Sequence, residues 1–215
     1  MNNKFSISEI DGINLVNKDM ENVLSVGIST NGNAELEMLS RNDNLFIIGT
    51  TIDKKGIENT KRIVSDKKIE NRFILKLEDV REKDIYEDKS FDYIYARLVL
   101  HYLNDKELLD VLKEFRRILK DNGLLYIVVR SDKCDEYINN LIKYDEKTGL
   151  SEHVTFTGNI DKRRFHNYET ISKAITGAGL NIKSIKDYDE ELFADYERTI
   201  PVSVRNNLIE VVCFK

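Results

Sequence analysis

The chain is poor in several residues from which common functional sites are built. Its 215 residues include one proline, two cysteines, three histidines and no tryptophan. Cys134 and Cys213 lie far apart without the close spacing of a zinc site, which indicates two free thiols in a reducing compartment. Three scattered histidines give no metal-ligand pattern either, so we expect no metal site.

Long apolar runs are also missing. No stretch approaches the roughly 20 apolar residues that span a bilayer, and the N-terminal sequence MNNKFSISEID lacks the apolar core of a signal peptide. We therefore expect a cytoplasmic protein without a membrane partner. The net charge of −5 argues against a broad nucleic-acid surface. There is no P-loop, no His-Glu-x-x-His motif and no nucleophile elbow.

What is present is an alternation of strand and helix patterns. Strand patterns cover residues 23–27, 45–49, 72–77, 91–96, 124–129, 180–185 and 208–214, and helix patterns cover 34–39, 54–65, 105–120 and 167–178. This order predicts a doubly wound α/β fold. Ligands of such folds bind at the carboxyl ends of the strands, near the point where the strand order reverses.

The segment from residue 91 to 130 is the most informative. FDYIYA is a strand pattern, and Asn104-Asp105 favours a helix start. One apolar helix face follows, formed by Leu108, Leu109, Leu112, Phe115, Ile118 and Leu119. Asn122-Gly123 is expected to end the helix, and LLYIVV suits a strand buried on both sides. Such a unit implies parallel strands joined by a right-handed crossover.

The same segment resembles the class I S-adenosylmethionine-dependent methyltransferases. Phe91-Asp92 matches the acidic start of that family's fourth strand. The segment 100–103 (LHYL) matches the one that follows it, and 117–120 (RILK) with Gly123 matches the helix end before the fifth strand. The likeness extends over about residues 22–215. It implies a Rossmann-like, mostly parallel seven-stranded sheet with an antiparallel last strand.

The resemblance also suggests how the chain is divided into parts. We expect residues 1–21 to form an N-terminal arm or helix and residues 22–215 to form one methyltransferase-like domain. Within that domain, residues 132–165 and 187–206 are expected to be insertions on the substrate side.

In this family a glycine-rich loop after the first strand holds S-adenosylmethionine, because glycine lacks a Cβ and tolerates positive φ. The expected pattern is acidic-x-Gly-x-Gly-x-Gly, and residues 25–32 read SVGISTNG. Gly27 is in register, whereas Ser29 and Asn31 replace the next two glycines and Ser25 replaces the acid. The alternative is an ordinary strand-to-helix turn in which Ser29 or Asn31 caps the helix.

The resemblance also implies the nucleoside contacts. Thr51 stands where the family has a ribose-binding acid, and Asp53 either supplies that carboxylate or caps the next helix. Asp79 and Val80 match the adenine-binding pair, unless Asp79 is an ordinary loop acid. Ala96 and Arg97 are expected at the methionine end, where Arg97 could pair with the cofactor's carboxylate.

The acceptor side is defined less sharply. His101 is a candidate general base, since an imidazole with a pKa near 6.5 can take a proton as the methyl group arrives; the alternative is a packed histidine. His166 and Tyr168 open the helix after the polar insertion. Tyr188 and Tyr196 lie in an acidic, aromatic segment that either lines the acceptor pocket or forms a charged surface loop.

These features predict methyl transfer from S-adenosylmethionine to a small-molecule acceptor. Because of Ser29 and Thr51 we expect weak cofactor binding. The alternative is a methyltransferase-like binding protein that has lost or weakened its cofactor site. A nucleic-acid methyltransferase is a third hypothesis, which the acidic charge balance and the lack of an Asn/Asp-Pro-Pro-Tyr segment disfavour.

Overall fold

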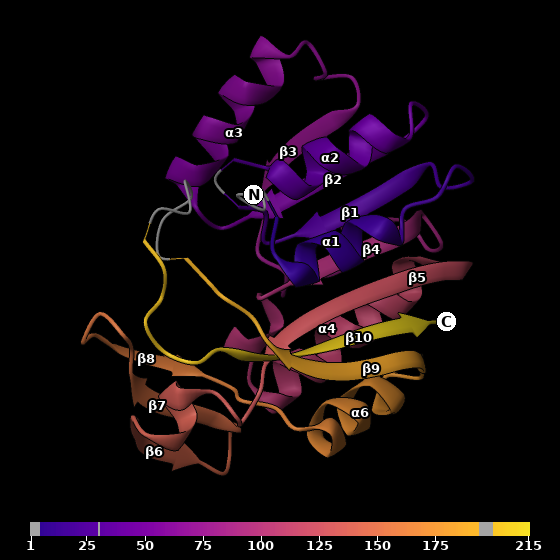
Figure 1. The fold of residues 1–215 in the computed structure, drawn as a ribbon. Coiled ribbons are helices and arrows are strands. Elements are labelled where there is room, and N and C mark those ends of the chain that lie inside the picture. The colour runs from indigo at the N-terminus through magenta and orange to yellow at the C-terminus, as the bar shows by residue number, and fades with distance from the viewer. Residues whose placement is uncertain (1–4, 30, 194–199) are drawn as a thin grey trace.

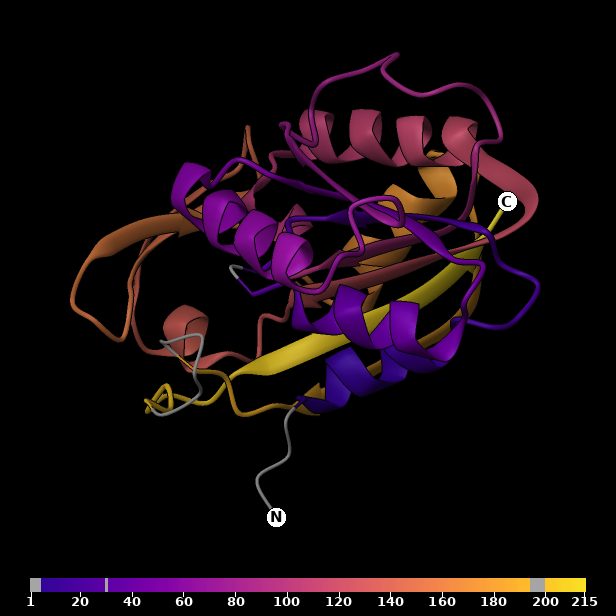
Figure 2. The ribbon, with the colours of Figure 1, turned by 90° about the horizontal axis from the view of Figure 1, so that it is seen from above.

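The computed structural model describes residues 5–29, 31–193 and 200–215, and its main feature is a seven-stranded sheet with helices on both faces (Figure 1). The strands are β1 (Asn22–Val26), β2 (Phe46–Thr51), β3 (Phe73–Leu77), β4 (Phe91–Arg97), β5 (Leu119–Arg130), β9 (Asn181–Asp189) and β10 (Asn207–Phe214). The helices beside it are α1 (Ile7–Asn14), α2 (Asn33–Arg41), α3 (Lys54–Asp66), α4 (Asp105–Ile118) and α6 (Tyr168–Gly177). In Figure 2, α1 and α2 cover one face, and α4 and α6 cover the other.

The strand order is β3-β2-β1-β4-β5-β10-β9, and β10 runs antiparallel to both of its neighbours. β1 pairs in parallel with β2 and β4, so that Val26 stands opposite Thr50 and Ala96. From β1 the chain moves outward through β2 and β3 and then returns to β4 on the other side. The carboxyl ends of β1 and β4 therefore form the switch point at which ligands of such sheets bind. The predicted α/β fold with its antiparallel last strand is confirmed.

Helix α4 begins where the sequence predicts. Asn104 and Glu107 form a capping box, in which each side chain accepts the other residue's backbone N–H, at 2.9 and 3.0 Å. The predicted end was wrong: the helix stops at Ile118, and Asn122-Gly123 lies within β5. The pairing with β4 explains the early stop, because Leu119 already pairs with Phe91 and the register then shifts. Lys120 also forms an ion pair of 2.8 Å with Asp92 of β4.

The N-terminal arm is a helix that docks on the sheet. The hydroxyl of Tyr93 donates to the carbonyl of Gly12 at 2.9 Å, and that of Tyr126 donates to the carbonyl of Ser8 at 2.6 Å. A Cβ at Gly12 would lie only 2.5 Å from the ring of Tyr95, so a larger residue there would push α1 off the sheet. No helix in the described ranges has both the length and the apolar character of a membrane span.

The polar insertion contains more structure than the sequence indicated. It forms a short helix, α5 (Asp135–Ile138), and an antiparallel sheet of β6 (Leu141–Asp145), β7 (Leu150–Val154) and β8 (Ile160–Arg163). The buried face of β7 carries Ser151 and His153, polar residues that conceal the usual apolar alternation of a strand. The backbone N–H of Arg164 donates to the carbonyl of His101 at 2.7 Å and ties this sheet to the main one.

Leu112 of α4 tests the packing of the main core. Its side chain is fully buried, as are those of Leu100, Phe115 and Leu119, as predicted. The change Leu112→Ala leaves a cavity and should lower the free energy of unfolding by about 2–5 kcal/mol. Urea unfolding measures this value, and a loss below about 1 kcal/mol would contradict the packing described.

Candidate functional site

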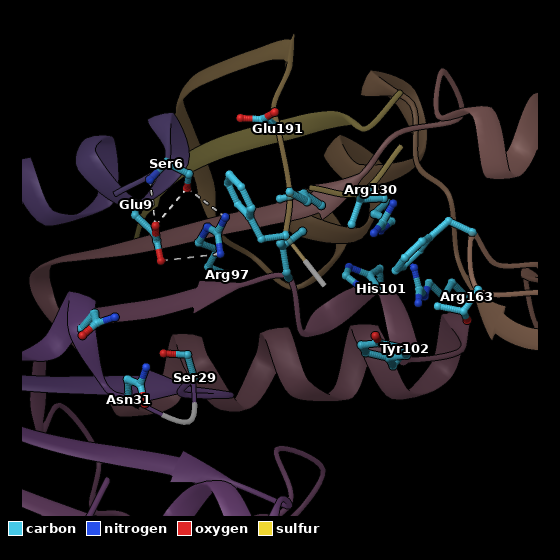
Figure 3. A pocket seen from close by; sticks show the side chains of 17 residues that line it. Ser6, Glu9, Ser29, Asn31, Arg97, His101, Tyr102, Arg130, Arg163 and Glu191 are labelled. Atoms are coloured by element: carbon cyan, nitrogen blue, oxygen red, sulfur yellow. Dashed lines mark hydrogen bonds and ion pairs between the residues drawn. The ribbon is translucent and has the colours of Figure 1, made fainter. Parts of the chain in front are cut away.

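Two neighbouring cavities lie at the carboxyl edge of the parallel strands. The smaller, of about 180 Å³, is lined by Val26, Gly27, Thr50, Thr51, Ile52, Glu78, Asp79, Val80, Arg81, Val99, Tyr102 and Leu103. The larger, of about 530 Å³, includes Ser29, Asn31, Arg97 and His101 in its wall (Figure 3). Tyr102 lines both cavities. The fold thus brings together segments from the ends of β1, β2, β3 and β4.

The loop after β1 makes a tight turn that requires glycine at its first position. Gly27 has φ +71°, and a Cβ there would lie 3.0 Å from Val99. The N-cap of α2 is Gly32, with φ +58°, so neither Ser29 nor Asn31 caps the helix. Asn31 instead accepts a hydrogen bond from Asn59 at 2.9 Å. Thr30 lies outside the described residues.

A buried carboxylate lies beside the position where the family pattern has its acid. The hydroxyl of Ser25 donates to Oε1 of Glu35 at 2.5 Å, and Glu35 is only 2% exposed. Burial raises the pKa of Glu35, although the Ser25 hydrogen bond opposes the rise. Among the residues that the structure describes, its Oε2 has no hydrogen-bond partner. Sequence reasoning missed this residue, although an acid on the buried face of α2, beside Ala34 and Met38, was a visible signal.

The candidate nucleoside contacts differ in their surroundings. Thr51 is 7% exposed and lines the smaller cavity, where its Oγ1 accepts from the backbone of Asp53 at 3.1 Å. Asp53 caps α3 by accepting from the backbone of Lys55 at 3.0 Å and does not line either cavity. Its alternative role as a helix cap is therefore confirmed.

Asp79 and Val80 both line the smaller cavity. The Asp79 carboxylate accepts three hydrogen bonds from Arg81, from its backbone N–H, Nε and Nη2, at 3.0, 2.9 and 2.5 Å. The Arg81 side chain holds the pKa of Asp79 below its usual range. An ionised carboxylate with free lone pairs therefore faces the smaller cavity.

Arg97 joins three parts of the chain at the wall of the larger cavity. Its guanidinium forms an ion pair of 2.8 Å with Glu190 and donates to Ser8 at 2.6 Å. It also donates to Ser6 at 3.0 Å (Figure 3). Burial alone would lower the pKa of Arg97, but Tyr95, Glu9 and Glu190 outweigh it and raise the value. These contacts occupy Arg97 in docking α1, which leaves less capacity for a ligand carboxylate than we expected. Ala96 is fully buried within β4 and lines neither cavity.

His101 lies in the short 3₁₀ helix η1 (Leu100–Tyr102) and is 2% exposed. Its ring centroid is 4.5 Å from that of Tyr102, and its Nδ1 has no hydrogen-bond partner within the described part of the chain. Burial, followed by the charges of Arg130 and Arg163, holds the pKa of His101 well below its ordinary value. The ring is therefore neutral near pH 7 and is a weak base in the absence of a ligand.

The other predicted acceptor contacts lie elsewhere. The hydroxyl of Tyr168 donates to Asp187 and that of Tyr188 to Glu210, both at 2.6 Å. These two tyrosines and the fully buried His166 line neither cavity, because their side chains hold α6, β9 and β10 together or pack inside. Tyr196 lies outside the described residues.

Both predicted insertions nevertheless reach the larger cavity. Its wall includes Phe156, Thr157 and Arg163 from residues 132–165, and Glu191, Leu192, Phe193 and Val202 from residues 187–206. Leu98, directly after β4, also lines it and has φ +56°, a strained value for a side chain of this type. In the described ranges, no three His, Cys, Asp or Glu side chains are placed to hold a metal ion.

Comparison with known proteins agrees with this geometry. Residues 24–127 match a family model described as a methyltransferase domain. An uncharacterized methyltransferase of Staphylococcus carnosus is 26% identical over 165 residues, covering 76% of this chain and 72% of that protein. The crystal structure of a SAM-dependent methyltransferase from Methanosarcina mazei superposes with a TM-score of 0.70 at 17% identity, covering 94% of this chain and 95% of that one. A further S-adenosylmethionine-dependent methyltransferase, from Clostridium acetobutylicum, gives 0.69 at 16% identity, covering 98% and 90%.

The chain thus resembles the class I S-adenosylmethionine-dependent methyltransferases in the sequence of residues 24–127 and in its fold. The resemblance found in residues 91–130 is thereby confirmed.

His166 provides a test of the buried histidines through pH. Burial lowers its pKa to about 3, so the folded state disfavours the charged ring, while the unfolded chain takes up a proton below about pH 6.5. Stability is therefore lost as the pH falls through 6.5, by about 2 kcal/mol between pH 7 and pH 5 from this residue. The variant His166→Gln should lose about that much less than the parent over the same range. Urea unfolding at both pH values measures the difference, and equal losses in the two proteins would contradict it.

Proposed function

We propose that the protein transfers a methyl group from S-adenosylmethionine to a small-molecule acceptor held in the larger cavity. The observation that carries this proposal is that Gly27, Thr51, Asp79 and Val80 converge on one small cavity, which shares Tyr102 with a larger one. The resemblance to methyltransferases suggests S-adenosylmethionine as the cofactor. The smaller cavity would receive its adenosine part, and Gly27 would lie under its methionine part.

The residues present fit the cofactor, with two weaknesses. Asp79 would accept from the adenine amine, Val80 would pack on the ring, and Gly27 would lie under the methionine part. The methionine ammonium group lacks the family's acid, because Ser25 stands at that position and Glu35, which accepts from Ser25, is 2% exposed and lines neither cavity. Thr51 offers the ribose one hydroxyl in place of two anionic oxygens.

When bound, the cofactor supplies an electrophilic methyl group on a sulfonium. The chain's own contribution is to hold the acceptor in line and to exclude water. Helix α1, the β7–β8 turn and the segment after β9 form the walls that do so. His101 would orient the acceptor through a hydrogen bond, and its lowered pKa makes it a better orienting group than a proton carrier.

The alternative is a binding protein that no longer takes the cofactor. The side chains of Ser29 and Asn31 occupy the loop face where the family has glycine, and this observation favours the alternative. Calorimetry with S-adenosylmethionine separates the two hypotheses. Saturable binding supports the enzyme, and silence at millimolar concentration supports the binding protein.

Asp79 tests the adenine contact. The variant Asp79→Ala should weaken binding of S-adenosylhomocysteine at least about tenfold, because a hydrogen bond to a charged group contributes about 1.5–3 kcal/mol. Asp43→Ala is a matched control, since Asp43 is fully exposed and does not line either cavity. Calorimetry measures both affinities. Unchanged affinity in Asp79→Ala would remove this residue from the site.

The two departures from the family pattern can be reversed together. The double variant Ser29→Gly/Thr51→Asp removes a side chain at the loop and restores the ribose acid. It should tighten S-adenosylhomocysteine binding about tenfold or more, since a hydrogen bond to a charged group contributes about 1.5–3 kcal/mol. Unchanged or weaker binding in the same calorimetric assay would mean that this loop holds the cofactor by another geometry or does not hold it.

A further inference from the structure

One end of the larger cavity carries nitrogen donors that are not among the expected cofactor contacts. His101, Arg130 and Arg163 lie together there, on the other side of the cavity from Ser29 and Asn31 (Figure 3). The three residues come from η1, the end of β5 and the end of β8, so the small insertion sheet completes the group. We refer to His101, Arg130 and Arg163 as the donor cluster.

The two guanidinium groups of the donor cluster share one buried carboxylate. Arg130 lies 2.9 Å and Arg163 lies 3.2 Å from the same Oε2 of Glu136, which is 1% exposed. Arg163 has a second partner, Asp161, whose side chain is 36% exposed and so is screened by water. Arg130 also donates to the neutral amide oxygen of Asn206 at 2.6 Å. Inside the wall, two positive groups therefore face a single desolvated negative charge.

His101 adds an unused polar atom at the same place. Its Nδ1 is buried and without a hydrogen-bond partner among the described residues, which costs free energy unless a ligand supplies one. The neutral imidazole can present an N–H toward an anion beside the two guanidinium groups.

Apolar side chains line the same cavity. Tyr102 and Phe156 lie in the cavity wall, and the guanidinium of Arg163 lies 5.5 Å from the centre of the Tyr102 ring. Leu98 and Leu192 also line the cavity. A flat or aromatic body would pack against these side chains while its anionic group met the donor cluster.

We propose that the donor cluster binds the carboxylate of a small aromatic ligand. We identify this ligand with the methyl acceptor, and that step rests on the proposed function. The cofactor's own carboxylate is the other source of the same chemistry. The placement of the donor cluster away from Ser29 and Asn31 favours the acceptor.

Benzoate and benzamide are matched probes for this site, since they share shape and differ in charge. In protein with ¹³C-labelled histidine, benzoate should shift the ring C2–H signal of His101 saturably. Benzamide should bind at least tenfold more weakly. The variant His101→Gln assigns the signal. Equal shifts with both probes, or none with either, would overturn the proposal.

Charge variants on β8 separate the donor cluster from general electrostatics. Arg163→Met should weaken benzoate binding at least tenfold, and Arg163→Lys should retain most of it. Lys162→Met removes the same charge from the neighbouring exposed residue, which pairs with Glu152 outside the cavity, and should leave binding unchanged. Equal affinity in Arg163→Met and Lys162→Met would contradict the assignment. The benzoate and benzamide comparison on the parent protein stands even if Arg163→Met fails to fold.

Saturating S-adenosylhomocysteine distinguishes the two sources of the carboxylate. If the donor cluster serves the acceptor, benzoate still binds to the protein filled with S-adenosylhomocysteine. Competition between the two would give the donor cluster to the cofactor and overturn the proposal. Benzoate binding in a protein that does not bind S-adenosylhomocysteine would leave the carboxylate site intact and remove the proposed methyl transfer.

Discussion

The parallel pairing of β1 with both β2 and β4 is the constraint on which the site depends. Val26 stands opposite Thr50 and Ala96, so three strands end at one edge. The chain leaves β1 toward β2 and later enters β4 on the other side, and the crossovers therefore diverge at this edge. The tight turn at Gly27 follows from the same pairing, since the N–H groups of Gly27 and Ile28 both donate to Thr50, at 2.9 and 3.0 Å. Gly27, Thr51 and Arg97 lie at these ends, and Asp79 and Val80 follow the end of β3, which is the neighbour of β2.

Many of the helices and strands could be predicted because they depend on patterns of neighbouring residues. The apolar face of α4, the cap at Asn104 and the continuous apolar run of β5 require only neighbours in the sequence. The end of α4 could not be predicted in this way, because the pairing of Leu119 with Phe91 is a contact between distant segments. The sheet of β6–β8 was also hidden, since its buried face carries Ser151 and His153 where apolar residues are usual.

The same contrast between local patterns and distant contacts applies to the candidate site. Gly27, Asp79 and Val80 were predicted from the family resemblance, and they line the smaller cavity. Arg97 lies in the wall of the larger cavity, but its partners Ser6, Ser8 and Glu190 come from distant segments that no local pattern indicates. Glu35 is the converse case. The sequence has Ser25 where the family pattern has an acid. In the fold, the hydroxyl of Ser25 lies 2.5 Å from the carboxyl group of Glu35.

We infer that the carboxyl edge of the parallel strands binds S-adenosylmethionine despite Ser29 and Thr51. A crystal structure of the protein grown with S-adenosylhomocysteine tests it most directly. We expect adenine beside Asp79 and Val80 in the smaller cavity, with the amino-acid end over Gly27. An empty smaller cavity, or the ligand bound elsewhere at saturating concentration, would contradict it.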